Sequence, residues 1–263
     1  MSGLSLESAR ASPASRRRIR AFDTVVLILS MLALWQAVGS WTSGVAIAPP
    51  WQTLVYLLGL VRTWMFWDHA AATLIAFVMA FLLSTLIGLA LGLILGMRSF
   101  AGEVAEPLLA GFYTIPKVTL YPVVLLIFGL GLSAKVAFGV MHGLVPITLF
   151  TLGAVRNLSA VLIRTAKVLH LSPGRTLRWI LVPACMPDIV NGLRIGFSLS
   201  LLGVLIGEMF SSQRGLGFLL VNGMAQHNVP LSTAIVTVIV VVAIAANTLM
   251  LRLGRRTAPR SVH

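Results

Sequence analysis

Three ionisable side chains lie within long segments that are otherwise apolar, namely His142, Arg194 and Glu208. An ionisable group is unfavourable in apolar surroundings, so residues of this kind often bind a charged ligand or transfer a proton. The sequence alone leaves a structural interpretation open for each. His142 can bridge neighbouring segments, and Arg194 can pair with Asp188 or reach water. Glu208 can form a salt bridge with Arg214 and shape the turn that follows.

A basic, partly amphipathic stretch separates two apolar segments and reads RTAKVLHLSPGRTLRWILVP from Arg164 to Pro183. Ser159 can cap a first helix that has one apolar face. That face consists of Leu162, Ala166 and Leu169. Ser172 and Pro173 suit the start of a second helix, which we expect to end at Pro183. A projection of this kind can contact a partner protein or lie on a lipid surface.

The residues needed for catalysis are missing. The phosphate-binding pattern G-x-x-x-x-G-K-[S/T] does not occur, and the sequence has only seven Asp and Glu residues. Cys185 is the single cysteine, which excludes an intrachain disulfide, and no Cys or His spacing resembles a metal site. We therefore expect no catalytic residues and no cofactor or metal in this chain.

The elements that position these residues are apolar helices. Of 263 residues, 58% are hydrophobic and 10% are charged, and the mean hydropathy is +0.96, as in an integral membrane protein. Apolar runs without period-2 alternation predict an all-α fold, a polytopic membrane helix bundle of about six transmembrane helices. The predicted spans are Phe22–Ser40, Thr73–Gly96, Thr119–Leu132, Val136–Ala154, Ile189–Met209 and Ser232–Leu251.

The net charge of +13 is distributed unevenly between the predicted spans. Counted from the N-terminus, the odd-numbered segments carry 16 Lys and Arg residues and the even-numbered segments carry 3. The positive-inside rule then predicts a multi-pass protein with both termini in the cytoplasm. The basic clusters suit this topology and contact with the anionic lipid bilayer, and no basic patch interleaved with aromatic residues favours nucleic acid.

The same features divide the chain into four parts. Residues 1–21 form a basic cytoplasmic tail, and residues 22–72 a first transmembrane helix, kept as a signal anchor, with a Trp-rich outer interfacial segment. Residues 73–252 form the core, with cytoplasmic helices at 157–187, and residues 253–263 form a second basic tail.

Within the core, three glycines at four-residue spacing predict close packing of one helix against another. They are Gly88, Gly92 and Gly96. Prolines on the inner side predict a short helix from about Ala101 to Thr114 before the third span, and Pro146 predicts a kink in the fourth.

The basic stretch resembles the cytoplasmic coupling loop of bacterial ABC importer permeases. The pattern of that loop is Glu-Ala-Ala, three residues, Gly, nine residues, Ile, one residue, Leu, Pro. Three positions match the pattern: Ala166, Ile180 and Pro183. Four positions depart from it, with Arg164 for the Glu, Thr165 for the first Ala, His170 for the Gly and Val182 for the Leu.

Three further segments are similar to the permease branch that imports nitrate, taurine and alkanesulfonates. They are TIPKVTLYPVVLLIFGLG, GLRIG and GEMFSSQRGLGFLL, in the order and at the spacing of that branch. The resemblance covers most of the chain from Thr73 to Arg252 and implies the type I ABC importer permease (MetI-like) fold.

The resemblance also implies partners and a role. It implies a homodimer in the bacterial inner (plasma) membrane, two cytoplasmic ATPase subunits that bind ATP and Mg, and an extracytoplasmic solute-binding protein. The chain would itself be no enzyme but a transporter subunit for a small polar or anionic solute. The implied ATPase-coupling residues are Leu162, Arg164, Thr165, Ala166, Lys167, Leu169, His170, Gly174, Ile180 and Pro183. The candidate residues of the translocation path are His142, Arg194 and Glu208.

Two departures from the coupling pattern carry expectations. Histidine is unfavourable in left-handed geometry, so we expect the turn to shift from His170 into Ser172–Gly174. Arg164 reverses a charge at the docking surface, which suggests a dedicated ATPase with an acidic contact. An ATP-independent secondary transporter or channel, or a membrane scaffold, remains an alternative to the importer.

Overall fold

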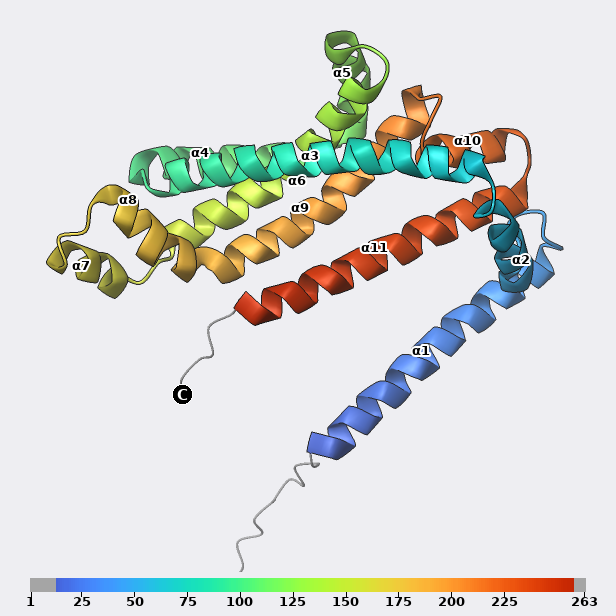
Figure 1. Cartoon of the computed structure of the whole chain (residues 1–263), viewed down its shortest axis with the longest axis horizontal. Coiled ribbons are helices and arrows are strands. Elements are labelled where there is room, and N and C mark those ends of the chain that lie inside the picture. Colours follow the sequence, from blue (N-terminus) through green and yellow to red (C-terminus); the bar gives the residue numbers. More distant parts are fainter. Residues whose placement is uncertain (1–12, 258–263) are drawn as a thin grey trace, which may run out of the picture.

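A computed structural model describes residues 13–257, with side chains described at 22–251 except those of Ala160, Ile163, Lys167 and Pro173 (Figure 1). The described chain consists of helices and the turns that join them. The elements are α1 Pro13–Trp41, α2 Pro50–Leu60, α3 Trp64–Gly96, α4 Ser99–Thr114, the 3₁₀ helix η1 Lys117–Leu120, α5 Tyr121–Phe128, α6 Leu132–Arg156, α7 Ala160–Val168, α8 Pro173–Thr176, the π-helix η2 Leu177–Leu181, α9 Val182–Ser211, α10 Leu216–Ala225 and α11 Val229–Thr257.

Five helices of the described part are long and apolar enough to cross a membrane, and a bent pair makes a sixth if it is counted as one span. The five are Phe22–Trp41, Trp64–Gly96, Leu132–Arg156, Gly174–Ser211 and Val229–Leu251. The predicted all-α bundle is therefore confirmed. Most predicted spans are shorter than the helices that contain them, because hydropathy windows end at the first charged residue and helices do not.

The predicted third span, Thr119–Leu132, is wrong as a straight helix, because this segment is the second half of a bent helix pair. Helix α4 and the segment Lys117–Phe128 meet at an angle of 87°. The chain is extended at Ile115, as expected for a residue before proline, and α5 ends at Gly129 with a φ of 71°. The predicted short helix is confirmed as α4, which begins at Ser99.

Helices α3, α6 and α9 form the centre of the bundle (Figure 1). The predicted close packing is confirmed, because a methyl group on Gly88 would lie 2.9 Å from the Ile147 side chain and one on Gly96 2.7 Å from that of Val155. Close approach of this kind holds helices together in lipid, where water provides no driving force. Helix α6 continues through Pro146, which is itself buried.

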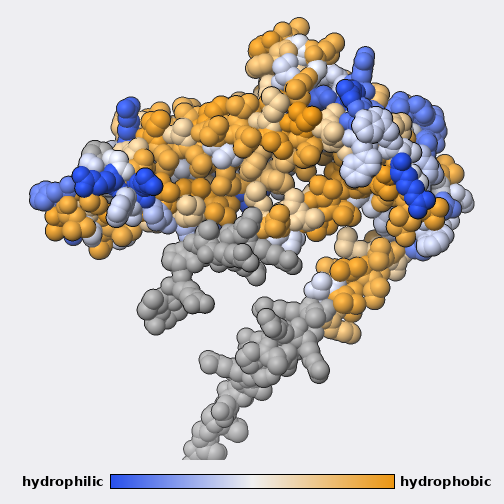
Figure 2. Space-filling model, viewed as in Figure 1, coloured by the Kyte–Doolittle hydropathy of each residue, from blue (hydrophilic) through white to orange (hydrophobic). Residues whose placement is uncertain are grey.

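The remaining long helices lie at the periphery. Only 6% of the first span and 11% of the last are buried inside the chain. Figure 1 shows α1 diverging from the bundle, with α2 and α10 near its junction. Figure 2 shows apolar residues over the middle of the bundle and hydrophilic residues at its two ends, as expected for a protein whose middle faces lipid.

Helices α8, η2 and α9 form one continuous helical segment, Gly174–Ser211 in its apolar part. The predicted end of the second short helix at Pro183 is therefore wrong. A π turn shifts the hydrogen-bond register by one residue, and the N–H of Val182 donates to the carbonyl of Leu177. The helix can thus continue past a proline that has no N–H to offer.

Candidate functional site

The projection formed by α7 and η2 exposes apolar side chains. Val161, Val168 and Leu169 are 66%, 76% and 61% exposed, and Trp179 is 72% exposed. Ala166 on the same helix is only 5% exposed. The apolar face of α7 therefore has a covered edge and an open surface.

Helix α7 ends in a Schellman motif with His170 at the left-handed position. His170 has a φ of 47°, and the N–H of Leu171 donates to the carbonyl of Ala166 at 3.1 Å. The expectation that the turn would shift to Ser172–Gly174 is therefore wrong. The six-to-one hydrogen bond of this motif stabilises the left-handed geometry at His170 although the residue is not glycine.

The other predicted coupling residues are spread along the projection. Leu162, Arg164 and Thr165 are exposed on α7. Gly174 lies in α8 and is exposed, whereas Ile180 is half-buried in η2. Pro183 is exposed at the start of α9, and the side chain of Lys167 lies outside the described residues.

A buried polar cluster occupies the far end of the bundle, where α3, α6 and α9 meet the turn before α10. Glu208 is fully buried and accepts hydrogen bonds from the hydroxyl of Thr73 at 2.8 Å and from the N–H of Gly217 at 3.0 Å. Lys135 Nζ lies 3.8 Å from Glu208 Oε1 and donates to the carbonyl of Arg214 at 2.8 Å. The carboxylate is thus surrounded by donors from three elements.

The turn is built around this carboxylate. Gly215 has a φ of 128°, and a methyl group there would collide with the carboxyl of Glu208. The N–H of Gly215 donates to Nδ1 of His69 at 3.0 Å. Glu208 therefore shapes the Gly215–Gly217 turn, as one sequence interpretation held, but its ionic partner is Lys135 and not Arg214.

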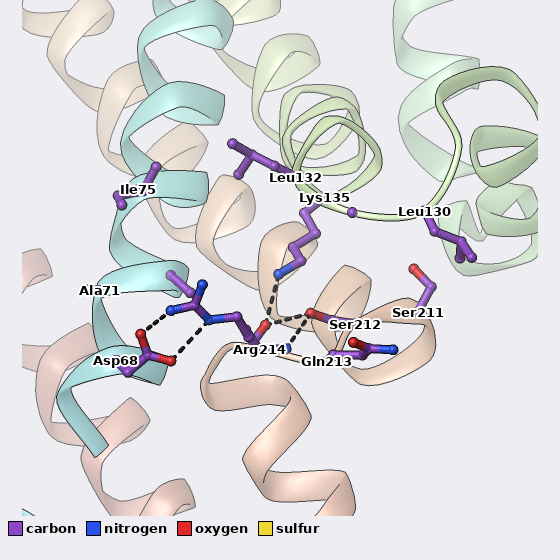
Figure 3. A pocket seen from close by; sticks show the side chains of 12 residues that line it. Asp68, Ala71, Ile75, Leu130, Leu132, Lys135, Ser211, Ser212, Gln213 and Arg214 are labelled. Atoms are coloured by element: carbon purple, nitrogen blue, oxygen red, sulfur yellow. Dashed lines mark hydrogen bonds and ion pairs between the residues drawn. The ribbon is translucent and has the colours of Figure 1, made fainter. Parts of the chain in front are cut away.

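A pocket of about 870 Å³ opens beside the cluster. Figure 3 shows Arg214 reaching across it to Asp68, with which it forms a bidentate ion pair. The lining residues are Asp68, Ala71, Ala72, Ile75, Leu130, Gly131, Leu132, Lys135, Ser211, Ser212, Gln213 and Arg214. Each cation of the pocket already has a polar partner within the chain.

The three sequence candidates do not come together. His142 is 8% exposed in α6, where its Nδ1 lies 2.9 Å from the carbonyl of Phe138 and its ring packs on the ring of Phe138. Arg194 is partly buried in α9, and no ion pair among the described side chains joins it to Asp188. Residues six apart on a helix lie on different faces, which explains why that pairing is missing.

Sequence reasoning missed two buried lysines, Lys117 and Lys135, which it counted as loop charges. These residues are 8% and 5% exposed and lie in η1 and α6. A signal was available for Lys135, because it stands alone within an apolar helical pattern that begins at Leu132. Its partner Glu208 is distant in sequence, and no local pattern links the two.

Residues 84–263 match the family described as binding-protein-dependent transport system inner membrane component. The chain belongs to this family. It is similar over 227 residues to a probable ABC transporter permease protein of Haemophilus influenzae, with 28% identity, 86% of this chain and 93% of that protein covered. The riboflavin transport system permease protein RibX of Chloroflexus aurantiacus is 33% identical over 82% of each chain. The taurine transport system permease protein TauC of Escherichia coli is 25% identical over 94% of this chain and 91% of that protein.

The bundle is also similar to a solved permease structure. Inward-facing MetNI, a methionine ABC transporter, superposes with a TM-score of 0.63 at 18% identity, covering 74% of this chain and 97% of that chain. The predicted type I ABC importer permease fold is confirmed. As a member of its family, the chain is a multi-pass inner membrane component of an ABC importer. It is not an enzyme, and ATP belongs to a partner ATPase.

Proposed function

We propose that two copies of this chain form the translocation path of the importer and that the projection at residues 157–187 couples the path to ATP hydrolysis. In this proposal residues 73–252 are the moving core, and the basic tails at 1–21 and 253–263 anchor it at the cytoplasmic surface. ATP binding draws the ATPase subunits together, and their motion is passed to the core through the projection.

The exposed apolar surface of α7 and η2 carries this proposal. Val161 and Val168 on α7 and Trp179 on η2 are each more than half exposed on the part of the chain that protrudes from the bundle. Exposed apolar surface rimmed by charges is typical of a protein contact. Arg164, Arg175 and Arg178 are exposed beside it, so an acidic rim on the ATPase is the complementary surface.

The solute we propose is small and polar or anionic, such as a sulfonate, nitrate or taurine. The support is similarity to the taurine permease TauC and to the aliphatic sulfonates permeases SsuC of Bacillus subtilis and Escherichia coli, at 23% and 28% identity. The relatives also include riboflavin and glycine betaine permeases, so the similarity narrows the solute only to a class.

Substitution of Val161 by aspartate tests the coupling surface. Val161 lies in the first turn of α7, where an acidic residue favours the helix, so Val161→Asp should leave α7 folded. A carboxylate buried without a partner at a docking face costs about 3 kcal/mol, so about a hundredfold weaker binding, and little ATPase co-purifying with this variant, is expected. The measurement is ATPase recovered and ATP hydrolysed per permease after pulldown from membranes.

Ser159→Asp is the matched control. Ser159 precedes α7, is exposed, and its hydroxyl accepts from the N–H of Val161 at 3.3 Å, a role that aspartate also fills. This variant adds the same charge outside the apolar surface and should retain the ATPase. Equal recovery with both variants would refute the apolar surface of α7 as the docking surface, and recovery of no ATPase with the unaltered chain would refute the proposed coupling.

A further inference from the structure

Lys117 is buried at the break between α4 and α5. Lys117 is 8% exposed, although Ile115 and Val118, which lie on either side of it in the sequence, are 42% and 43% exposed. The ammonium donates to the carbonyl of Tyr113 at 3.1 Å and lies 4.9 Å from the centre of the Tyr113 ring and 5.9 Å from that of Phe112. The lysine thus points back over the end of α4.

No carboxylate of the described chain neutralises this ammonium. The ion pairs among described side chains belong to Lys135, Arg156 and Arg214. Among the described residues the Lys117 ammonium has one hydrogen-bond acceptor, although an ammonium has three donors. A buried cation normally has an anionic partner, and since no described carboxylate provides one, we look for this partner in a ligand.

The break lies near the middle of the bundle. Helix α4 packs alongside α3 from the end where α3 stops, and its 16 residues extend about 24 Å, half the length of the 33-residue α3 (Figure 1). Helix α5 projects away from the bundle at this level (Figure 1). Broken helices at mid-membrane level are where transport proteins place solute sites, because unpaired backbone and side-chain groups gather there.

A second polar group, His142, is linked to the α4–α5 break by a series of aromatic contacts. Tyr121, one turn after Lys117, packs edge-on against Phe138, which packs in turn on His142. Since a carbonyl only accepts, Nδ1 of His142 donates to Phe138, and Nε2 of the neutral ring is an acceptor without a partner among the described residues.

We propose that Lys117 binds the anionic group of the transported solute at the α4–α5 break, with Nε2 of His142 accepting from an N–H or O–H donor of the same solute. The proposal rests on the transport function proposed above and narrows its solute to a small organic anion, of which a sulfonate or carboxylate is the simplest. A single ammonium beside aromatic rings binds such a group less tightly than an arginine that forms two parallel hydrogen bonds. Weaker binding suits a site that must release its ligand.

The test uses the full chain with its ATPase in nanodiscs and follows the midpoint of thermal unfolding. Sodium methanesulfonate is the probe, dimethyl sulfone is the uncharged molecule of similar shape, and sodium chloride at equal ionic strength is the reference. A ligand that binds only the folded protein raises the midpoint in a saturable way. We expect such a rise with methanesulfonate and none with dimethyl sulfone.

Two variants of Lys117 separate binding from a structural role. Lys117→Gln keeps a donor for the Tyr113 carbonyl but has no charge, and should weaken methanesulfonate binding about tenfold or more. Lys117→Arg keeps the charge and should bind. Arg98→Gln removes an exposed cation from the other end of α4 and should bind as the unaltered chain does.

Unchanged binding by Lys117→Gln, whatever its unfolding midpoint, would reduce Lys117 to a cap of α4 and overturn the proposal. Absence of a saturable effect in the unaltered chain would overturn it too. The two proposals fail separately. Loss of binding in Lys117→Gln without a co-purified ATPase supports the anion site and refutes the proposed coupling projection, and the reverse result refutes the anion site alone.

Discussion

At the scale of single residues, two ion pairs of the described chain differ in how deeply they are buried. Lys135 and Glu208 form a pair at the far end of the bundle, joined by Thr73 and the N–H of Gly217. The pair between Asp68 and Arg214 lies nearby, but its side chains are 31% and 61% exposed. Water screens the second pair and not the first, so the two should differ in their effect on stability.

Glu208→Gln should lower the free energy of unfolding by about 3 kcal/mol, because it leaves Lys135 buried without an anion. Asp68→Asn should lower it by no more than about 1 kcal/mol. The measurement is the unfolding midpoint of the full chain in detergent. The double variant Lys135→Met with Glu208→Gln should recover part of the loss, and strictly additive effects would contradict a coupled pair.

At the scale of elements, two helices end with histidine in left-handed geometry. His170 follows α7 with a φ of 47°, and His227 follows α10 with a φ of 55°. After α10 the N–H of Asn228 donates to the carbonyl of Gly223 at 2.8 Å, which repeats the pattern after α7. The shared hydrogen bond outweighs the unfavourable backbone of histidine at both positions.

His227→Gly should raise the free energy of unfolding by about 1 kcal/mol, because glycine is not hindered in this geometry. His227→Val should lower it, since a β-branched residue is the least tolerant. His170→Gly should stabilise α7 in the same direction and restores the residue of the coupling pattern. Thermal unfolding of the variants in detergent measures the order, and a destabilised His227→Gly would show that the imidazole itself holds the turn.

The elements also show what local sequence can predict. Span number, the short helix before the third span and the glycine face of α3 follow from bilayer thickness and helix periodicity, which act locally. The left-handed His170 and the helix through Pro183 depend on hydrogen bonds formed only once neighbouring turns exist. Lys135 can be buried because it pairs with Glu208. The two residues are far apart in the sequence, so a pattern read locally around Lys135 does not include Glu208.

At the scale of the whole molecule, the two ends of the bundle differ in character. The end with α7 and α8 carries exposed arginines and apolar side chains, whereas the far end carries the polar cluster, the pocket and exposed tryptophans. Trp41, Trp51 and Trp64 are 88%, 71% and 83% exposed, as expected for an aromatic belt at the membrane interface. We propose that the α7 end and both termini are cytoplasmic.

Cysteine labelling tests this orientation in a Cys185→Ala background, which is suitable because Cys185 is buried. Arg62→Cys, in the turn between α2 and α3, should react with a membrane-impermeant maleimide in intact spheroplasts. Arg175→Cys, exposed on α8, should react only in inverted vesicles. The opposite labelling pattern would invert the topology and remove the projection from reach of a cytoplasmic ATPase.

The uninterrupted helix of 38 residues from Gly174 to Ser211 has a mechanical meaning. Trp179 lies near one end of it, and Glu208 near the other is fastened to the turn before α10. In the proposed coupling, a rod of this kind acts as a lever arm, so displacement of the end that contacts the ATPase tilts the opposite end. The helix is long enough to cross a bilayer, and its regular hydrogen bonding is altered at the π turn Leu177–Leu181 and at Pro187.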